Sequence, residues 1–142
     1  MAREQALQTL ETWHDLLEKR EFDRLRPLAA DTVVFRSPAF FTPYPGVEPL
    51  VHIISTVTTI FEDFAYHRTF WSEGHESVVL EFSAKVGGKR LKGIDIISFD
   101  DAGKIREFEV MIRPANAAAA VGEAMAAKAG PRLKALLGGL KA

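Results

Sequence analysis

The fold of this chain is decided by residues 76–112, which read ESVVLEFSAKVGGKRLKGIDIISFDDAGKIREFEVMI. The stretch is rich in β-branched and aromatic residues that alternate with polar ones, a pattern typical of strands. Gly87-Gly88 predicts a tight hairpin turn, and residues 100–103 predict a second turn. We therefore expect consecutive antiparallel strands at about 76–86, 90–99 and 104–112, preceded by another at 64–71.

The residues before these strands predict helices and one further strand. A helix over residues 3–19 has an apolar stripe at helical spacing, formed by Leu7, Leu10, Trp13 and Leu17. A short helix at 21–29 and a strand at 31–37 follow. The loop at 38–46 contains three prolines and a glycine, which exclude regular structure, and a helix is expected at 47–61.

The residues after the strands predict an Ala-rich helix that ends near Lys128. Gly130-Pro131 is expected to break it, and residues 132–137 to form one more short helix. We expect this stretch to pack on the mouth of the domain or on a partner through its apolar residues, which are Val121, Met125, Leu133, Leu136, Leu137 and Leu140.

The order of elements is helix, helix, strand, helix, four strands and helix. Because strands and helices do not alternate, a doubly wound parallel sheet is excluded in favour of the α+β class. We expect a curved, mostly antiparallel sheet that forms a cone closed by the N-terminal helices, in the order ααβαββββ plus a C-terminal helix. Residues 1–142 are then a single domain, with the cone at about 3–113 and a helical extension at about 114–142. Such a concave sheet favours an internal pocket.

Composition excludes several classes of protein. The net charge is -1, so no overall field recruits nucleic acid or an anionic membrane. Cysteine is absent, which excludes disulfides, thiolate nucleophiles and cysteine metal sites. No signal peptide and no membrane-spanning apolar stretch is recognised, so a cytoplasmic protein is expected.

Asp95 is the most informative residue for function. On a strand it shares a face with Leu91, Ile97 and Phe99. A carboxylate among apolar side chains costs free energy unless it is paired, hydrogen-bonded or protonated. The sequence leaves two interpretations open: a functional acid whose pKa is raised, or a structural ion pair with Arg113, Arg36 or Arg90.

Two motifs resemble those of a known superfamily. Residues 94–99 with the turn 100–104 resemble the ketosteroid isomerase strand that carries an oxyanion-hole aspartic acid, and Asp95 falls on that acid. Residues 13–17, followed by Glu21-Phe22-Asp23, resemble the first isomerase helix, and Trp13 falls on its oxyanion-hole tyrosine. Over roughly residues 5–113 the chain is thus similar to the nuclear transport factor 2-like (cystatin-like cone) superfamily, and within it to SnoaL-like domains and ketosteroid isomerases.

The chain departs from the isomerase pattern at two places. The isomerase base is an Asp just before a proline in the first strand, and Ser37 occupies that place, with Arg36 before it and Pro38 after it. A further site tyrosine corresponds to Ile54. Arg36 and Ser37 are adjacent on a strand, so only one of them can face inward: Arg36 to bind an anion or pair with Asp95, or Ser37 as a hydrogen bonder.

These comparisons define a candidate site with Asp95 as its acid. The expected substrate-binding residues are Trp13, Phe35, Arg36, Ser37, Ile54, Ile97, Phe108 and Val110. Trp13 can line the pocket and bond a ligand oxygen, or simply pack in the core. The loop with Phe40, Phe41 and Tyr44 is a lid, a dimer contact or a segment folded back on its own core.

Other polar residues are given structural roles. The four histidines have no metal-ligand spacing, so no metal is expected, and each is interpreted as a surface or satisfied core residue. His67 is expected on the same strand face as Ala65, Thr69 and Trp71. A solvated or dimer-facing sheet surface is expected from Glu81, Ser83, Lys85, Glu107 and Glu109.

Two functions remain open on the sequence. The first is a small-molecule enzyme, an isomerase, cyclase or hydrolase without metal or cofactor, that acts on an apolar oxygen-bearing substrate with Asp95 as acid. The alternative is a non-catalytic ligand-binding or dimerisation module, which predicts Asp95 bonded to an arginine. In both cases the expected partners are a small hydrophobic molecule and a second copy of the chain, and neither nucleic acid nor a membrane.

Overall fold

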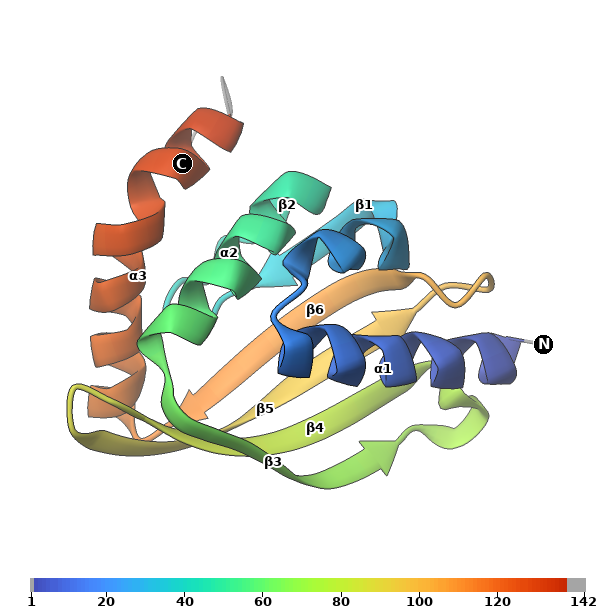
Figure 1. Cartoon of the computed structure of the whole chain (residues 1–142), viewed down its shortest axis with the longest axis horizontal. Coiled ribbons are helices and arrows are strands. Elements are labelled where there is room, and N and C mark those ends of the chain that lie inside the picture. The colour runs from blue at the N-terminus through green and yellow to red at the C-terminus, as the bar shows by residue number, and fades with distance from the viewer. Residues whose placement is uncertain (1, 138–142) are drawn as a thin grey trace.

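The protein has a six-stranded curved sheet with helices over its concave face (Figure 1). The structure is a computed structural model that describes residues 2–137. Its helices are α1 (Ala2–Lys19), η1 (Phe22–Leu28), α2 (Val47–Ile60), η2 (Glu73–His75) and α3 (Ala115–Leu137). Its strands are β1 (Ala29–Arg36), β2 (Tyr44–Pro45), β3 (Glu62–Trp71), β4 (Ser77–Val86), β5 (Lys89–Phe99) and β6 (Ile105–Arg113). The expected α+β class and order of the main elements are confirmed, with β2 and η2 as short additions.

The strand order in the sheet is β2-β1-β6-β5-β4-β3. Strand β1 pairs in parallel with β6, and the other neighbours are antiparallel. The β4–β5 hairpin keeps one register from Ser77 opposite Ser98 to Val86 opposite Lys89. Its turn requires positive φ at two successive positions, 54° at Gly87 and 79° at Gly88, which glycine adopts without strain.

Strand β3 is irregular, unlike the hairpin beside it. Tyr66 lies opposite Phe82 and Thr69 lies opposite Leu80, so three steps along β3 match two along β4. The extra residue inverts the alternation of side chains between the two faces. The expectation that His67 shares one face with Thr69 is therefore wrong, because His67 bonds Ser83 on the outer face whereas Thr69 pairs with Leu80, an inward residue.

The main core lies between the sheet and helices α1 and α2. Helix α1 buries Ala6, Leu10, Trp13 and Leu16, so its stripe is rotated from the expected one. Leu7, which was expected in the stripe, is 39% exposed. A second buried cluster joins the β4–β5 hairpin to the end of α2 and the start of α3, and contains Ile60, Phe82, Ala84, Val86, Leu91, Ala117 and Val121.

Two expected boundaries are wrong. The loop at 38–46 contains the short strand β2, in which Tyr44 and Pro45 pair with β1 at the sheet edge, where a proline costs no ladder hydrogen bond. Helix α3 continues through Gly130-Pro131 to Leu137, with Pro131 inside it. In Figure 1 its upper part bends away from the lower turns, as expected where a proline interrupts helical hydrogen bonds. Leu140 lies outside the described residues.

Candidate active site

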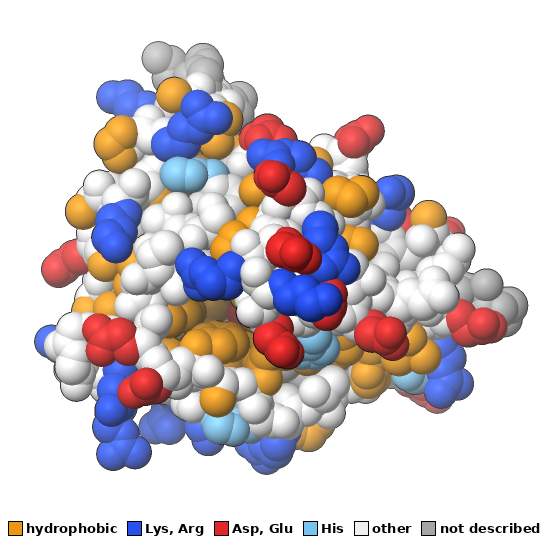
Figure 2. All heavy atoms as spheres, viewed as in Figure 1, with side chains coloured by type: hydrophobic (Ala, Val, Ile, Leu, Met, Phe, Trp, Pro, Cys, Tyr) orange, Lys and Arg blue, Asp and Glu red, His pale blue; other side chains and the backbone are white. Residues whose placement is uncertain are grey.

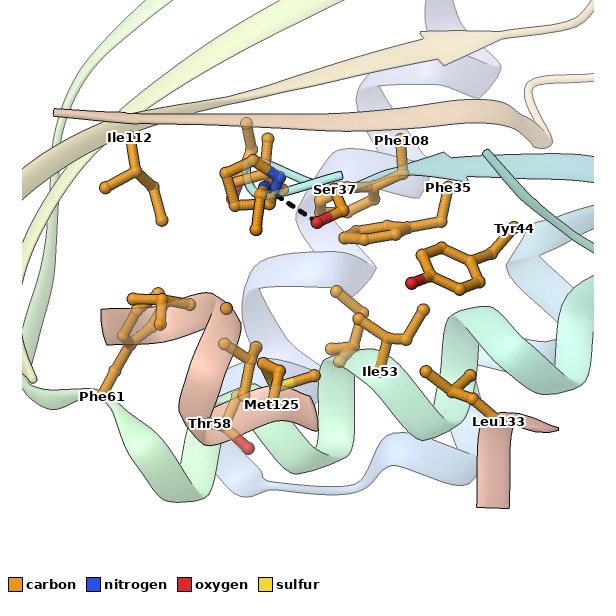
Figure 3. A pocket seen from close by; sticks show the side chains of 18 of the residues that line it. Phe35, Ser37, Tyr44, Ile53, Thr58, Phe61, Phe108, Ile112, Met125 and Leu133 are labelled. Atoms are coloured by element: carbon orange, nitrogen blue, oxygen red, sulfur yellow. Dashed lines mark hydrogen bonds between the residues drawn. The ribbon is translucent and has the colours of Figure 1, made fainter. Parts of the chain in front are cut away.

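A cavity of about 1340 Å³ lies between the concave face of the sheet and the helices. On the face shown in Figure 2, a hollow lined by hydrophobic side chains leads into the molecule. Figure 3 shows the rings of Phe35, Phe108 and Tyr44 facing Ile53 of α2, with Met125 and Leu133 of α3 on the helical side. The cavity is therefore mostly apolar and aromatic, with few polar groups.

Asp95 lies on the cavity wall and is only 6% exposed. The Tyr66 hydroxyl donates a hydrogen bond of 2.6 Å to its Oδ2 atom. The indole Nε1–H of Trp13 donates in turn to the Tyr66 oxygen at 3.2 Å. The three residues form a chain of donors that starts at Trp13 and ends at Asp95.

The second carboxyl oxygen of Asp95, Oδ1, has no hydrogen-bond partner among the described residues. Within the same part of the chain, no side-chain nitrogen or oxygen is both buried and unpartnered. Because Asp95 lines the cavity, Oδ1 is therefore the atom that the cavity reaches. A ligand oxygen there can accept a hydrogen bond from a protonated Asp95.

Burial raises the pKa of Asp95 from its ordinary value of 3.8 to about 7, and the hydrogen bond from Tyr66 acts in the opposite direction. The pKa of Tyr66 is held well above its ordinary value by burial and by the neighbouring Asp95 carboxylate. Tyr66 is therefore a permanent donor, and Asp95 exchanges its proton near neutral pH. A carboxyl group in this state is suited to general acid or base catalysis.

The structure contradicts the structural interpretation of Asp95. That interpretation required an ion pair with Arg113, Arg36 or Arg90. In the described chain, Asp95 belongs to no salt bridge and its partner is the neutral hydroxyl of Tyr66. No cation therefore holds Asp95 in the ionised form.

Trp13 lines the cavity, but its polar group points elsewhere. Its ring is 2% exposed and packs edge-on against Phe108, with 5.3 Å between the ring centroids. Because the N–H bonds Tyr66, it does not supply a hydrogen bond to a ligand directly. Trp13 instead fixes the orientation of the Tyr66 hydroxyl, since the oxygen that accepts from Trp13 must turn its own hydrogen toward Asp95.

Arg36 and Ser37, the two candidates at the end of the first strand, point to opposite sides, as expected for adjacent residues. Arg36 donates a hydrogen bond to Glu107 at 2.6 Å and is not part of the cavity wall. The expectation that Arg36 faces the pocket is therefore wrong. Ser37 does line the cavity. Its Oγ accepts hydrogen bonds from the backbone N–H groups of Ala39 and Phe40 at 2.9 and 3.3 Å, so the hydroxyl stabilises the turn into the aromatic loop.

Of the other expected pocket residues, all but one line the cavity. Phe35, Ile54, Phe108 and Val110 line the cavity. Ile97 is fully buried in the main core, opposite Val78 and Phe108, and is not among the lining residues. Their role in binding a substrate stays a prediction.

The aromatic loop and α3 cover one side of the cavity. Phe40 and Tyr44 line it, whereas Phe41 is 97% exposed. Helix α3 meets this loop at Gly122, where a Cβ atom would lie 2.7 Å from the Cβ of Ala39. Glycine at this position allows the helix to close over the cavity.

Sequence reasoning missed Tyr66 and His14. The chain has only two tyrosines, and Tyr66 lies in β3 opposite the inward residue Phe82. Strict alternation of side chains along this strand does not predict that Tyr66 reaches Asp95. His14 was interpreted as a surface or satisfied core residue, yet it lines the cavity with its ring edge-on to Tyr66. Its position directly after Trp13 on the helix was the available signal.

The described part of the chain has neither a metal-binding cluster nor a membrane-spanning helix. Among residues 2–137, no three His, Asp or Glu side chains come together as a group that could hold a metal ion. In the same residues, no helix is long and apolar enough to cross a bilayer.

Comparison with known proteins identifies the fold. Residues 10–108 match the model of the SnoaL-like domain. A steroid delta-isomerase from Pseudomonas aeruginosa is similar over 94% of each chain, with 49% identity and a TM-score of 0.84. An uncharacterised bacterial protein with a cystatin-like fold from Silicibacter pomeroyi is 28% identical over 89% of this chain and 90% of that one, with a TM-score of 0.80.

More distant structures share the architecture only. An epoxide hydrolase of M. tuberculosis is 15% identical over 92% of this chain and 99% of that one, with a TM-score of 0.61. Comparison with curated proteins found no match. The match over residues 10–108 establishes that this chain belongs to the SnoaL-like domain family, and the Silicibacter pomeroyi structure shows its fold to be cystatin-like.

Proposed function

We propose that this protein is an isomerase that moves a carbon–carbon double bond in a largely apolar carbonyl compound of steroid-like size. The observation that carries the proposal is the open Oδ1 atom of Asp95, at the end of the donor chain from Trp13 and Tyr66. Asp95 binds the carbonyl oxygen of the substrate and transfers its proton to it as negative charge develops there.

The direction of the donor chain supports this role. Tyr66 gives its only hydrogen to Oδ2, so a proton on Asp95 has its place on Oδ1, toward the cavity. Each donor in the chain polarises the next, which strengthens the final hydrogen bond to the ligand. An apolar surrounding raises the strength of such a bond further, because no water competes for it.

The cavity supports the substrate class. Its volume of about 1340 Å³ exceeds the roughly 300–1,000 Å³ of common ligand pockets, so a molecule of several fused rings fits. Phe35, Tyr44 and Phe108 supply flat apolar faces, and Asp95 is the acid at the inner wall. An apolar skeleton with a single carbonyl oxygen matches this distribution.

The similarity to the steroid delta-isomerase of Pseudomonas aeruginosa supports the reaction type. The similarity covers nearly the whole chain at 49% identity, which supports a shared reaction type beyond the shared fold. We therefore take a steroid with a carbonyl group and a non-conjugated double bond as the first substrate to test.

A β,γ-unsaturated 3-oxosteroid is a direct probe, because its conversion to the conjugated enone is followed by ultraviolet absorbance. Wild-type protein should bind and convert it. Asp95→Asn keeps a donor toward the cavity and an acceptor for Tyr66 but cannot give up a proton, so the steroid should still bind while kcat falls about 10²–10⁴-fold. Glu81→Gln, which changes a buried carboxylate on the opposite face of the sheet, is the matched control and should keep kcat.

Full activity of Asp95→Asn with an intact fold would contradict the proposal. Binding of the steroid without any conversion by the wild type would favour the non-catalytic alternative. The expected homodimer remains a prediction, and a monomeric mass by light scattering would contradict it.

A further inference from the structure

We infer that His14 is the base that complements Asp95: its imidazole takes a proton from a carbon atom of the ligand while Asp95 binds the ligand oxygen. This inference rests on the proposed function and deepens it. A double-bond shift requires a proton acceptor, and the first-strand place that the resemblance assigns to it holds Ser37, whose hydroxyl is used in a backbone turn.

Helix α1 directs His14 toward the donor chain. Successive residues of an α-helix are turned by about 100°, so Trp13 and His14 present neighbouring sides. Trp13 points into the core against Phe108, and His14 lies against Tyr66, with 5.3 Å between the ring centroids and an angle of 82° between the planes. Tyr66 therefore contacts both His14, through its ring, and Asp95, through its hydroxyl.

Both ring nitrogens of His14 are available. Neither bonds a side-chain or backbone group of the described residues, and no side-chain nitrogen there is both buried and unpartnered. The residue is partly buried and lines the cavity. Two of the other histidines use a ring nitrogen: His52 bonds the carbonyl of Ala129, and His67 bonds Ser83. His75 stacks on Trp71 and does not line the cavity.

The protonation states support the pairing. Burial lowers the pKa of His14 below its ordinary value of 6.5, so the imidazole is neutral and basic at neutral pH. Asp95 is shifted in the opposite direction. Two titratable groups whose surroundings move their pKa values apart are a recurring arrangement for an acid and a base in one site.

The part of the cavity wall formed by residues 2–137 has further titratable or charged side chains. They are Glu18 of α1, Arg20 after it, Tyr44 of β2, Tyr66 of β3 and Lys134 of α3, besides Asp95 of β5. Glu18 is the rival base, but it lies one helical turn beyond His14, and within residues 2–137 no hydrogen bond or ion pair joins it to Tyr66 or Asp95. His14 is the acceptor adjacent to the donor chain.

The step balances without a co-reactant. The imidazole lone pair of His14 takes the proton from the carbon between the carbonyl and the double bond. The C–H electrons form a double bond to the carbonyl carbon, and the carbonyl π electrons move to oxygen, which takes the proton of Asp95. The O–H bond then returns its proton to Asp95 and its electrons re-form the carbonyl. The double bond formed in the first step moves between the α- and β-carbons, and the π electrons of the original double bond take the proton from the imidazolium at the γ-carbon, which gives the conjugated ketone.

The test uses the full chain and the β,γ-unsaturated 3-oxosteroid. His14→Gln keeps a polar side chain without a base at neutral pH, so kcat should fall about 10²–10⁴-fold with KM changed far less. His67→Gln is the matched control, because it removes a histidine from the outer face, and it should behave as wild type. Added imidazole should restore part of the turnover of His14→Ala, which a purely structural role would not predict.

The pH profile provides a second readout. For the wild type, kcat/KM should rise as His14 loses its proton below neutrality and fall as Asp95 loses its proton near pH about 7. His14→Gln should lose the acidic limb and Asp95→Asn the alkaline limb. Turnover that instead rises through neutral pH would assign the base to Asp95 and overturn the inference.

The two proposals fail in different ways. If the wild type converts the steroid and His14→Gln keeps kcat within about fivefold, or if Glu18→Gln abolishes turnover instead, the inference is wrong and the proposed function stands. NMR adds a readout without catalysis: the bound steroid should shift the His14 ring signals more than those of His67, and equal shifts would overturn the inference. Wild-type protein that neither binds nor converts the steroid would overturn both.

Discussion

Two carboxyl groups on neighbouring strands have nearly the same burial and opposite chemistry. Asp95 on β5 and Glu81 on β4 are both 6% exposed. Leu80 lies opposite Asp95 and Glu81 lies opposite Ile94, so the two carboxyl groups leave the sheet on opposite faces. Asp95 faces the cavity with a pKa raised to about 7, whereas Glu81 faces outward with a pKa lowered to about 2.

The two carboxyl groups differ in their partners. The Arg68 guanidinium binds both oxygens of Glu81 at 2.8 and 2.6 Å, and Lys92 lies 3.5 Å away. Such bidentate hydrogen bonding holds the carboxylate ionised. Of the two expectations for Glu81, solvated is wrong, because the residue is buried, and dimer-facing stays a prediction. Asp95 has a neutral phenol instead, so desolvation dominates and the proton is retained. A buried carboxyl group thus indicates a reactive site only when no cation compensates it.

Strand β3 supplies both partners from positions two residues apart. In a regular strand, Tyr66 and Arg68 would point to the same face. The register shift between Tyr66 and Thr69 separates them, so that Tyr66 reaches Asp95 inside and Arg68 reaches Glu81 outside. One extra residue in this edge strand therefore allows β3 to supply a partner to the buried acid on one face of the sheet and to the ion pair on the other.

The largest expected effect is a pH-dependent difference in stability between Asp95→Asn and the wild type. The folded state binds the Asp95 proton more tightly than the unfolded chain, so its stabilising effect is full below about pH 4 and lost as pH rises through about 7. Asp95→Asn lacks this loss, so its free energy of unfolding relative to wild type should rise by about 2–4 kcal/mol between about pH 4.5 and 8. Urea unfolding at each pH measures this.

Glu81→Gln is the contrasting variant in the same experiment. The contribution of Glu81 is present above its ordinary pKa of 4.5 and is lost as pH falls toward about 2. The variant should therefore be less stable than wild type at neutral pH, and the deficit should shrink in acid. Parallel pH dependences for the two variants would show that the two carboxyl groups do not differ as described.

Removing the phenol should have an intermediate effect. Tyr66→Phe keeps the ring but leaves the Trp13 N–H and Asp95 Oδ2 without a partner, at a cost of about 1–3 kcal/mol. Since the hydrogen bond from Tyr66 lowers the pKa of Asp95, its loss should move the alkaline limb of activity to higher pH. Tyr44→Phe is the control, with stability expected within about 0.5 kcal/mol of wild type. An unchanged alkaline limb in Tyr66→Phe would contradict the donor chain.

The smallest effect on turnover is expected from the outer pair. Arg68→Met keeps an unbranched apolar stem but leaves Glu81 with Lys92 alone. The urea midpoint should fall at neutral pH and approach that of wild type in acid, because a protonated Glu81 does not need the cation. Steroid turnover should stay within about twofold of wild type. A large loss of turnover in a folded Arg68→Met protein would mean that the two faces of the sheet are coupled.

Much of the inner site followed from the sequence. The period-two pattern around Asp95 placed it on the buried face with Leu91 and Phe99, and the helical pattern placed Trp13 in an apolar stripe. Both inferences depend only on local periodicity. Arg36 and Ile97 were misplaced because local pattern does not state which buried or half-buried residue borders a cavity.

The class of fold, the β4–β5 hairpin and the acid on its inner face follow from the residues alone, because these depend on alternation, turn chemistry and the cost of burying a charge. The protonation state and partners of that acid depend on contacts that form only when the chain folds. The irregular β3 directs Tyr66 to Asp95, and the packing of α1 brings His14 to the same cavity. The proton affinity of a buried carboxyl group is set by partners distant in sequence, and a strand pattern does not specify those partners.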